Sequence, residues 1–228
     1  MAVLQRLLVA LDCSAAASAA RDLAIDCARA FGGELIFLAV VDRGLAIAEM
    51  SAPSGASYDL VAVLETDART VLDEATSRAR AANVRSSTLL MDGRPGPTIV
   101  ACARLEHADG IVMGTAGMRG LERAFFGSTA ASVLRATGQP TMVVHGPDDP
   151  VRVVSTSFAR VFVACDDSEP ADAAFDFAID LAAQSGASLV FGTVLETGDL
   201  IDTSAMYGTT RSLSRAICAR RRSHASKR

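Results

Sequence analysis

The sequence contains a single lysine, Lys227, and no tryptophan. A P-loop needs a lysine directly after its glycines to neutralise the terminal phosphates, so the near absence of lysine excludes that nucleotide-binding motif. The apolar runs are short and interrupted, and none predicts a helix that crosses a membrane. Residues 1–6 also lack the basic-then-apolar pattern of a signal peptide. We therefore expect a cytoplasmic protein with no membrane partner.

Paired metal-ligating and catalytic residues are also missing. The five cysteines show neither C-x-x-C nor histidine-paired spacing, which argues against a zinc site and against a disulfide framework. We expect free thiols at all of these positions: Cys13, Cys27, Cys102, Cys165 and Cys218. Cys13 is further expected to be a small buried residue. His107 and His145 have no acidic or cysteine neighbour at ligand spacing, so no catalytic or metal-binding residue is predicted.

What is present is a globular composition. The 228 residues are 50% apolar, which is enough for one large domain or two small ones, and the net charge is −4. A net negative charge argues against a large basic surface of the kind that binds nucleic acid, so we expect no nucleic-acid partner. Arginines accumulate after Asp202, and no acidic residue follows it. Such a run is typical of a solvated tail, with nucleic-acid contact as the less favoured alternative.

Apolar runs of strand length alternate with helical patterns through the first two-thirds of the chain. Strands are predicted at residues 7–11, 34–41, 87–91, 111–113 and 140–144. Helices are predicted at residues 14–31, 59–82, 98–106 and 128–135, with Ser14 and Thr98 as N-caps and Gly32 as a stop signal. A β-α-β unit within one sheet has parallel strands and a right-handed crossover. The alternation predicts an α/β fold with a doubly wound, Rossmann-like, five-stranded parallel sheet.

Glycines cluster between the fourth predicted strand and the next helix, in the segment GTAGMRGLERAFFGST at residues 114–129. Glycine lets the backbone approach an anion closely, and Ser128 and Thr129 can open the helix with N–H and hydroxyl donors. The spacing is G-x2-G-x9-G-S, set by Gly114, Gly117, Gly127 and Ser128. It favours anion binding over an ordinary turn. The Rossmann fingerprint G-x-G-x-x-G is absent after the first strand, so backbone, hydroxyl and arginine groups are the donors left for a nucleotide.

This spacing, after a strand that ends in Met113-Gly114, resembles the ATP-binding signature of the universal stress protein family. Residues 7–14, 36–42 and 139–144 resemble the first, second and closing strands of that family, in family order. The resemblance implies an adenine nucleotide α-hydrolase-like fold that binds ATP. It leaves open whether Mg²⁺ accompanies the nucleotide. The nucleotide-binding residues that it implies are Asp12, Val40, Gly114, Gly117, Gly127, Ser128 and Thr129.

The resemblance also implies a role for each of these residues. Asp12 would face the ribose and the base, the backbone near Val40 would meet the adenine edge, and the glycines with Ser128 and Thr129 would wrap the phosphates. The closing strand, 140–144, would support a homodimer, or would pair within the chain with a linked second copy. From the residues alone, Asp12 could equally cap a helix beside Ser14, and Val40 could be plain core.

The start of the chain is repeated later in the sequence. Residues 6–42 align without a gap onto residues 160–196, and nearly half of the paired residues are identical. No second glycine segment follows, so we expect one nucleotide site per chain and a truncated or frame-shifted second copy. The predicted division is a universal stress protein domain with the ATP-binding loop at 1–146, a linker at 147–158, a partial second domain at 159–198 and a basic, flexible tail at 199–228.

The leading functional hypothesis is an ATP-binding stress-response sensor or adaptor whose nucleotide state changes its conformation or its choice of partner. One rival is slow ATP hydrolysis, with Asp12 orienting water or metal. Related α-hydrolases usually carry S-G-G-x-D-S or H-I-G-H signatures, and both are absent from this sequence. A second rival is an interaction module of the same fold that binds no nucleotide, which the glycine signature argues against.

Overall fold

The computed structural model describes residues 4–44, 60–115, 127–146, 158–166 and 168–193. The strands within these ranges are β1 (Arg6–Leu11), β2 (Glu34–Val41), β3 (Arg85–Asp92), β4 (Gly110–Gly114), β5 (Thr141–Val144), β6 (Arg160–Ala164) and β7 (Ser188–Gly192). The helices are α1 (Ala15–Phe31), α3 (Leu60–Ala81), α4 (Pro95–Leu105), α5 (Ser128–Ala136) and α6 (Glu169–Ser185). Strands and helices alternate from β1 to β5 and again from β6 to β7, and β5 and β6 are consecutive strands among the described residues.

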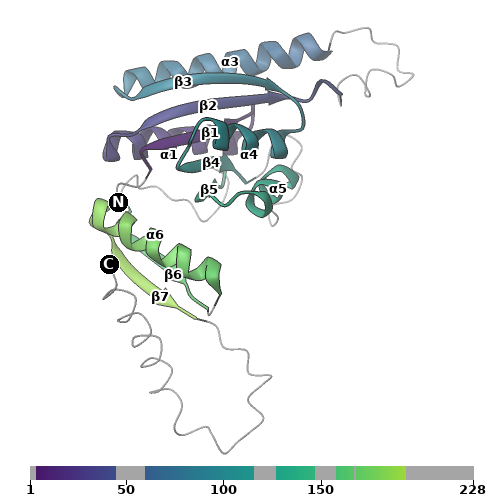
Figure 1. The fold of residues 1–228 in the computed structure, drawn as a ribbon. Coiled ribbons are helices and arrows are strands. Elements are labelled where there is room, and N and C mark those ends of the chain that lie inside the picture. Colours follow the sequence, from purple (N-terminus) through teal and green to yellow (C-terminus); the bar gives the residue numbers. More distant parts are fainter. Residues whose placement is uncertain (1–3, 45–59, 116–126, 147–157, 167, 194–228) are drawn as a thin grey trace, which may run out of the picture.

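Strands β1 to β5 form one parallel sheet in the order β3-β2-β1-β4-β5, with β3 and β5 at its edges (Figure 1). Leu8 of β1 is in register with Ile36 of β2 on one side and with Ile111 of β4 on the other. These central strands are apolar along their length because helices cover both faces of the sheet. The predicted α/β class and doubly wound parallel topology are confirmed.

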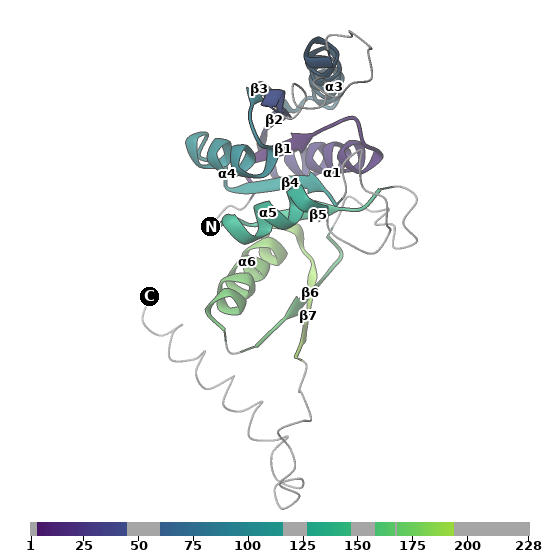
Figure 2. The ribbon, with the colours of Figure 1, turned by 90° about the vertical axis from the view of Figure 1, so that its right-hand side faces the viewer.

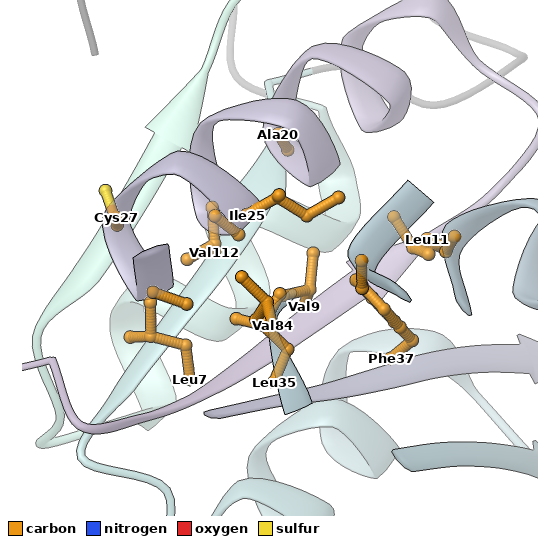
Figure 3. Packing of buried hydrophobic residues seen from close by; sticks show 14 of the residues in the cluster. Leu7, Val9, Leu11, Ala20, Ile25, Cys27, Leu35, Phe37, Val84 and Val112 are labelled. Atoms are coloured by element: carbon orange, nitrogen blue, oxygen red, sulfur yellow. The ribbon is translucent and has the colours of Figure 1, made fainter. Parts of the chain in front are cut away.

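The two faces of the sheet pack against different helices, and Figure 2 shows α1 and α4 on opposite sides of it. Leu7 and Val9 belong to the cluster formed with α1 and α3, which Figure 3 shows from close by. Leu8 points to the other face and packs in a second cluster with Ile99 of α4 and Val133 of α5. Successive strand residues point to opposite faces, so one unbroken apolar run fills both clusters.

The ends of α1 are as predicted. The Ser14 hydroxyl accepts a hydrogen bond from the Ala17 N–H at 3.1 Å, and Gly32 ends the helix in the left-handed conformation at φ 71°. Thr98 is not the N-cap of α4, so that prediction is wrong. The helix begins at Pro95 after Arg94, because proline fixes a helical φ and needs no N–H partner at the first helical position.

The burial predicted for Cys13 is also wrong, because this residue is exposed in the turn between β1 and α1. Met113, by contrast, is buried in the core at the end of β4. No helix within the described ranges combines the length and the hydropathy that a membrane span requires.

The second unit, β6-α6-β7, has the local geometry of β1-α1-β2. Its two strands pair in parallel in a sheet of their own. Ser168 caps α6 at φ −86° and ψ 151°, against −83° and 153° for Ser14, and Gly186 ends α6 at φ 74°. The same cap and stop residues therefore produce a helix with the same bounds in each unit.

The second unit contacts the five-stranded unit through apolar side chains. The rings of Phe31 and Phe158 stack with their centroids 6.2 Å apart. Leu181 of α6 is buried in the cluster that contains α1 and β1, and Met142 and Val144 of β5 pack against the same cluster. The contact lies beside the closing strand, and neither β6 nor β7 is hydrogen-bonded to β5 in the described sheets.

Candidate functional site

The candidate site lies at the carboxyl edge of the five-stranded sheet, where β1 and β4 are neighbours. From β1 the chain passes through α1 to β2, and from β4 it passes through α5 to β5 on the other side. Helices α1 and α5 therefore leave this point toward opposite faces of the sheet. In doubly wound folds this reversal of strand order is where ligands bind. Asp12 follows β1 at this edge, and Gly114 ends β4.

Backbone hydrogen bonds hold the two ends of the glycine segment together. The Thr115 N–H donates to the Val144 carbonyl at 2.8 Å, and the Gly127 N–H donates to the Thr115 carbonyl at 2.7 Å. Thr115 and Gly127, the described residues on either side of 116–126, therefore meet at the end of β4. Gly117 falls in this range, outside the described residues.

Packing by itself requires a glycine at position 114. A Cβ atom at this position would lie 2.8 Å from the Ala16 Cβ and 2.9 Å from the Ala16 carbonyl carbon. Real Cβ atoms do not approach other heavy atoms so closely. The glycine therefore lets the start of α1 approach the end of β4, and a substitution at Gly114 would disturb that packing before it tested binding.

The N-terminus of α5 presents backbone and hydroxyl donors at this edge of the sheet. Gly127 is its N-cap, at φ −58° and ψ 157°, and has no side chain to accept a hydrogen bond from the first turn. The first N–H groups of a helix have no partner within the helix, and the helix dipole makes this end partly positive. Ser128 is exposed and Thr129 is half-buried in that first turn. Backbone and hydroxyl donors at such a terminus suit a phosphate group.

Asp12 takes part in the turn that starts α1 and is also exposed to solvent. Its Oδ1 accepts a hydrogen bond from the Ser14 N–H at 2.9 Å, while Ser14 itself caps the helix. Asp12 thus orders the turn before the helix, while the N-cap itself is Ser14. Because the carboxylate is exposed at the carboxyl edge of β1, the same side chain is also accessible to a ligand.

The pairing between β1 and β2 ends at Leu11 and Ala39. Val40 is the next residue of β2, so it lies just beyond the end of that pairing. The Glu34 N–H donates to the Gln5 carbonyl, so the backbone groups of every second residue from Glu34 face β1. Those of Val40 consequently face the region beyond the end of β1. Its side chain packs against the cluster beneath α4 and α5, so the core alternative holds for the side chain, and a ligand role for the backbone stays a prediction.

The thiols in the turn after β1 and near the end of α1 are not activated. Desolvation raises the pKa of the Cys13 thiol, with further contributions from the negative charges of Asp67 and Asp12. Burial also raises the pKa of Cys27 to about 11, and Asp26 adds to that shift. These two thiols are therefore protonated at neutral pH. In the part of the chain that the structure describes, no group of three or more His, Cys, Asp or Glu side chains has metal-binding geometry.

Two residues that position the site were missed by sequence reasoning. Thr115 is only 7% exposed, and its backbone joins β4, β5 and the start of α5. Gly96 lets the start of α4 approach α5, because a Cβ there would lie 2.5 Å from the Ser132 Oγ. Thr115 could have been noticed as the residue that follows the first glycine of the motif. Gly96 gave no such signal, since its constraint comes from a helix distant in sequence.

The site and the fold can be compared with known proteins. A universal stress protein of Methanocaldococcus jannaschii is 31% identical over 144 residues, which cover 63% of this chain and 83% of that protein. One from Mycobacterium tuberculosis strain H37Rv is 32% identical over 117 residues, and the match covers 51% of this chain and 38% of that protein. The chain thus spans well under half of this mycobacterial relative.

The same fold occurs in a solved universal stress protein from Archaeoglobus fulgidus DSM 4304, with a TM-score of 0.67 at 24% identity. The alignment covers 96% of this chain and 74% of that one. The model of the family described as "Universal stress protein family" matches residues 4–145 and again residues 157–224. The first match contains every residue of the candidate site, and the second contains the whole second unit. The chain belongs to the universal stress protein family.

Proposed function

We propose that this protein binds ATP at the carboxyl edge of the five-stranded sheet and acts as a nucleotide-dependent stress-response sensor or adaptor. The observation that carries the proposal is the hydrogen bond from the Gly127 N–H to the Thr115 carbonyl. It brings the N-terminus of α5 to the end of β4, at the point where strand order reverses. Phosphate would bind there through backbone and hydroxyl donors, with Ser128 and Thr129 in the first turn.

The remaining contacts follow from the placement of the other two site residues. Asp12 is exposed at the end of β1, where it can face a ribose, and the Val40 backbone faces the region beyond β1, where it can meet an adenine edge. Gly114 and Gly117 complete the predicted phosphate contacts. Asp12 is the one carboxylate among these residues, so it is the group that would meet Mg²⁺ if the metal accompanies the nucleotide.

A direct link joins the phosphate site to the proposed contact strand. Thr115 accepts from Gly127 at the loop and donates to Val144 at the end of β5. Strand 140–144 is an edge of the sheet and is the proposed surface for a homodimer or for tandem pairing. A nucleotide that displaces the start of α5 would therefore shift Thr115, and through Thr115 it would shift the end of β5. This link gives a structural basis for a nucleotide-dependent choice of partner.

We further propose one nucleotide site per chain, in a domain formed by residues 1–146. Residues 147–158 would link it to the partial second domain at 159–198. Asp166 repeats the position of Asp12, but no glycine segment follows the second unit in the sequence. The second unit would therefore serve as a contact partner for the first domain rather than as a second site.

The proposal is tested by calorimetric titration of ATP, AMP and cyclic AMP into the wild type and two variants at Ser128. Ser128→Asp places a negative charge at a helix N-terminus, which suits the helix but repels phosphate, so ATP affinity should fall by about tenfold or more. Ser128→Ala removes one hydroxyl donor and should cost less than about tenfold. Titrations with Mg²⁺ and with a chelator show whether the metal takes part.

The outcomes separate the proposal from its rivals. Equal ATP affinity in the two variants would remove the α5 terminus from the site. No binding by the folded wild type would leave the interaction module as the function. Mg²⁺-dependent release of phosphate that is lost in Asp12→Ala would add slow hydrolysis to the binding role.

A further inference from the structure

One flank of the second unit is apolar, acidic and exposed. We call it the α6–β7 flank and define it by Asp172, Phe175, Asp176, Ile179 and Phe191. The rings of Phe175 and Phe191 lie with their centroids 4.9 Å apart. Even so, Phe191 is 48% exposed and Ile179 is 41% exposed, and the two aspartates are exposed beside them. Exposed apolar side chains of this size on α6 and the neighbouring β7 indicate a contact that the described residues leave uncovered.

In the five-stranded unit, α3 covers the equivalent surface of α1 and β2. The residues equivalent to Ile179 and Phe191 are Ile25 and Phe37, which are only 6% and 0% exposed. Both belong to the cluster that includes Leu72, Ala75 and Ala79 of α3. The flank is therefore uncovered because the second unit has no counterpart of α3 among its described elements.

Ion pairs also join α1 to α3 in the five-stranded unit. Arg21 Nη1 lies 3.0 Å from Glu74 Oε1, and Arg78 Nη1 lies 4.0 Å from Asp22 Oδ1. On α6 the residues equivalent to Arg21 and Asp22 are Phe175 and Asp176. The flank thus loses a cation and keeps an acid, so the helix that would cover it should be basic.

The chain that follows β7 has this character. Within residues 205–222, Met206, Leu213 and Ile217 are spaced at seven and four residues, which places them on one face of a helix. Five arginines accompany them and acidic residues are absent: Arg211, Arg215, Arg220, Arg221 and Arg222. Composition alone suggested a solvated tail here, but the second family match continues through residue 224.

The available length also fits. The five-stranded unit passes from β2 to α3 through residues 42–59, and residues 193–204 can serve as the corresponding connection after β7. A helix over residues 205–222 would be about 27 Å long, which is enough to span the strands of a small sheet.

We propose that residues 205–222 form a basic amphipathic helix that docks on the α6–β7 flank, in the position that α3 occupies over α1 and β2. The stripe of Met206, Leu213 and Ile217 packs on Ile179 and Phe191, and the flanking arginines pair with the acids of α6. This inference is independent of nucleotide binding at the other unit.

The test uses the full chain with a nitroxide spin label on Cys218, in a background that carries Cys13→Ser and Cys165→Ser. These two substitutions remove the exposed and half-buried thiols, while Cys27 and Cys102 are buried. Docking predicts that the label broadens the amide NMR signals of Asp176 and Ile179 strongly and leaves those of α3, such as Asp73, unchanged. Broadening confined to residues next to β7 along the chain would overturn the proposal.

Two matched pairs of variants sharpen the result. Asp176→Arg should reduce the broadening of α6 signals at least twofold, whereas Asp73→Arg makes the same charge change on an exposed residue of α3 and should have no effect. Ile217→Asp should release the segment, whereas Ser212→Asp, away from the apolar stripe, should not. Equal effects within either pair would contradict docking at this flank.

A mixing experiment identifies the occupant. Isotope-labelled chain without the nitroxide is mixed with unlabelled chain that carries it. Docking within the chain predicts no broadening in this mixture. Broadening of α6 signals in the mixture would mean that a second copy covers the flank, and this would overturn the proposal.

Discussion

The units β1-α1-β2 and β6-α6-β7 share their order, caps and strand register, but they differ in burial. Arg6 pairs with Glu34 in the first unit, and Arg160 pairs with Ser188, at the equivalent positions, in the second. Each helix begins after a serine that caps it and ends at a glycine. Yet Leu8 is fully buried, whereas Phe162 at the equivalent position is 67% exposed.

This difference separates local from tertiary causes of structure. A cap, a stop glycine and apolar strand residues act within a few neighbours, so they work equally in both units. Burial depends on what else packs on the sheet. In the first unit β4, α4 and α5 complete the core around Leu8, and these elements have no counterpart among the described residues of the second.

The largest expected effect is a contrast between two substitutions at equivalent positions. Leu8→Ala should lower the free energy of unfolding by about 3 kcal/mol, because it leaves a cavity in a closed core. Phe162→Ala should cost less than about 1 kcal/mol, because most of that ring is already in water. Urea unfolding followed by far-UV circular dichroism measures both.

Equal losses in the two variants would break the comparison, since they would show that Phe162 is covered in solution. Leu134→Ala is a control for exposed apolar side chains in the five-stranded unit, where this residue is 41% exposed. It should behave like Phe162→Ala.

The fold was largely predictable because its signals are local. The β2 range, 34–41, follows from an apolar run placed directly after the paired glycines that end α1. The start of α4 was not predictable from Thr98, because the proline at the first helical position is a stronger start signal than a threonine three residues later. The exposure of Cys13 depends on what covers the turn after β1, which the sequence does not specify locally.

For the site, the motif indicates which residues belong to it but not which tertiary contacts require them. Spacing and resemblance predict Asp12, Val40, Gly114 and Gly127 as site residues, and all four lie at the carboxyl edge of the sheet. Their binding roles stay predictions. The close approach of Ala16 to Gly114 and the hydrogen bond between Gly127 and Thr115 join residues far apart in sequence, so no local pattern could give them.

A smaller effect tests whether the helix caps are equivalent. Ser14→Ala and Ser168→Ala each remove a hydroxyl that accepts from the N–H three residues later, at 3.1 Å and 3.3 Å. Each loss should cost about 1 kcal/mol locally, which corresponds to roughly fivefold faster amide exchange at Ala17 and at Ala171. Hydrogen exchange followed by NMR provides the measurement. A large effect in one unit and none in the other would show that the surrounding core, and not the cap, starts the helix.

The smallest effect concerns one hydrogen bond that distinguishes the two turns. The Ser168 hydroxyl donates to Asp166 Oδ1, and the Ser168 N–H donates to the same oxygen at 2.9 Å. These bonds, the side-chain bond first, lower the pKa of Asp166 below 3.8. A lowered native pKa means that the stabilisation is complete above the unfolded value and is lost as the pH falls through the native one. Titration of the Asp166 carboxyl signal by NMR should therefore show its pKa rising toward 3.8 in Ser168→Ala and staying unchanged in Ser14→Ala. An unchanged value in Ser168→Ala would mean that the hydroxyl serves the cap alone, and the two turns would then be equivalent.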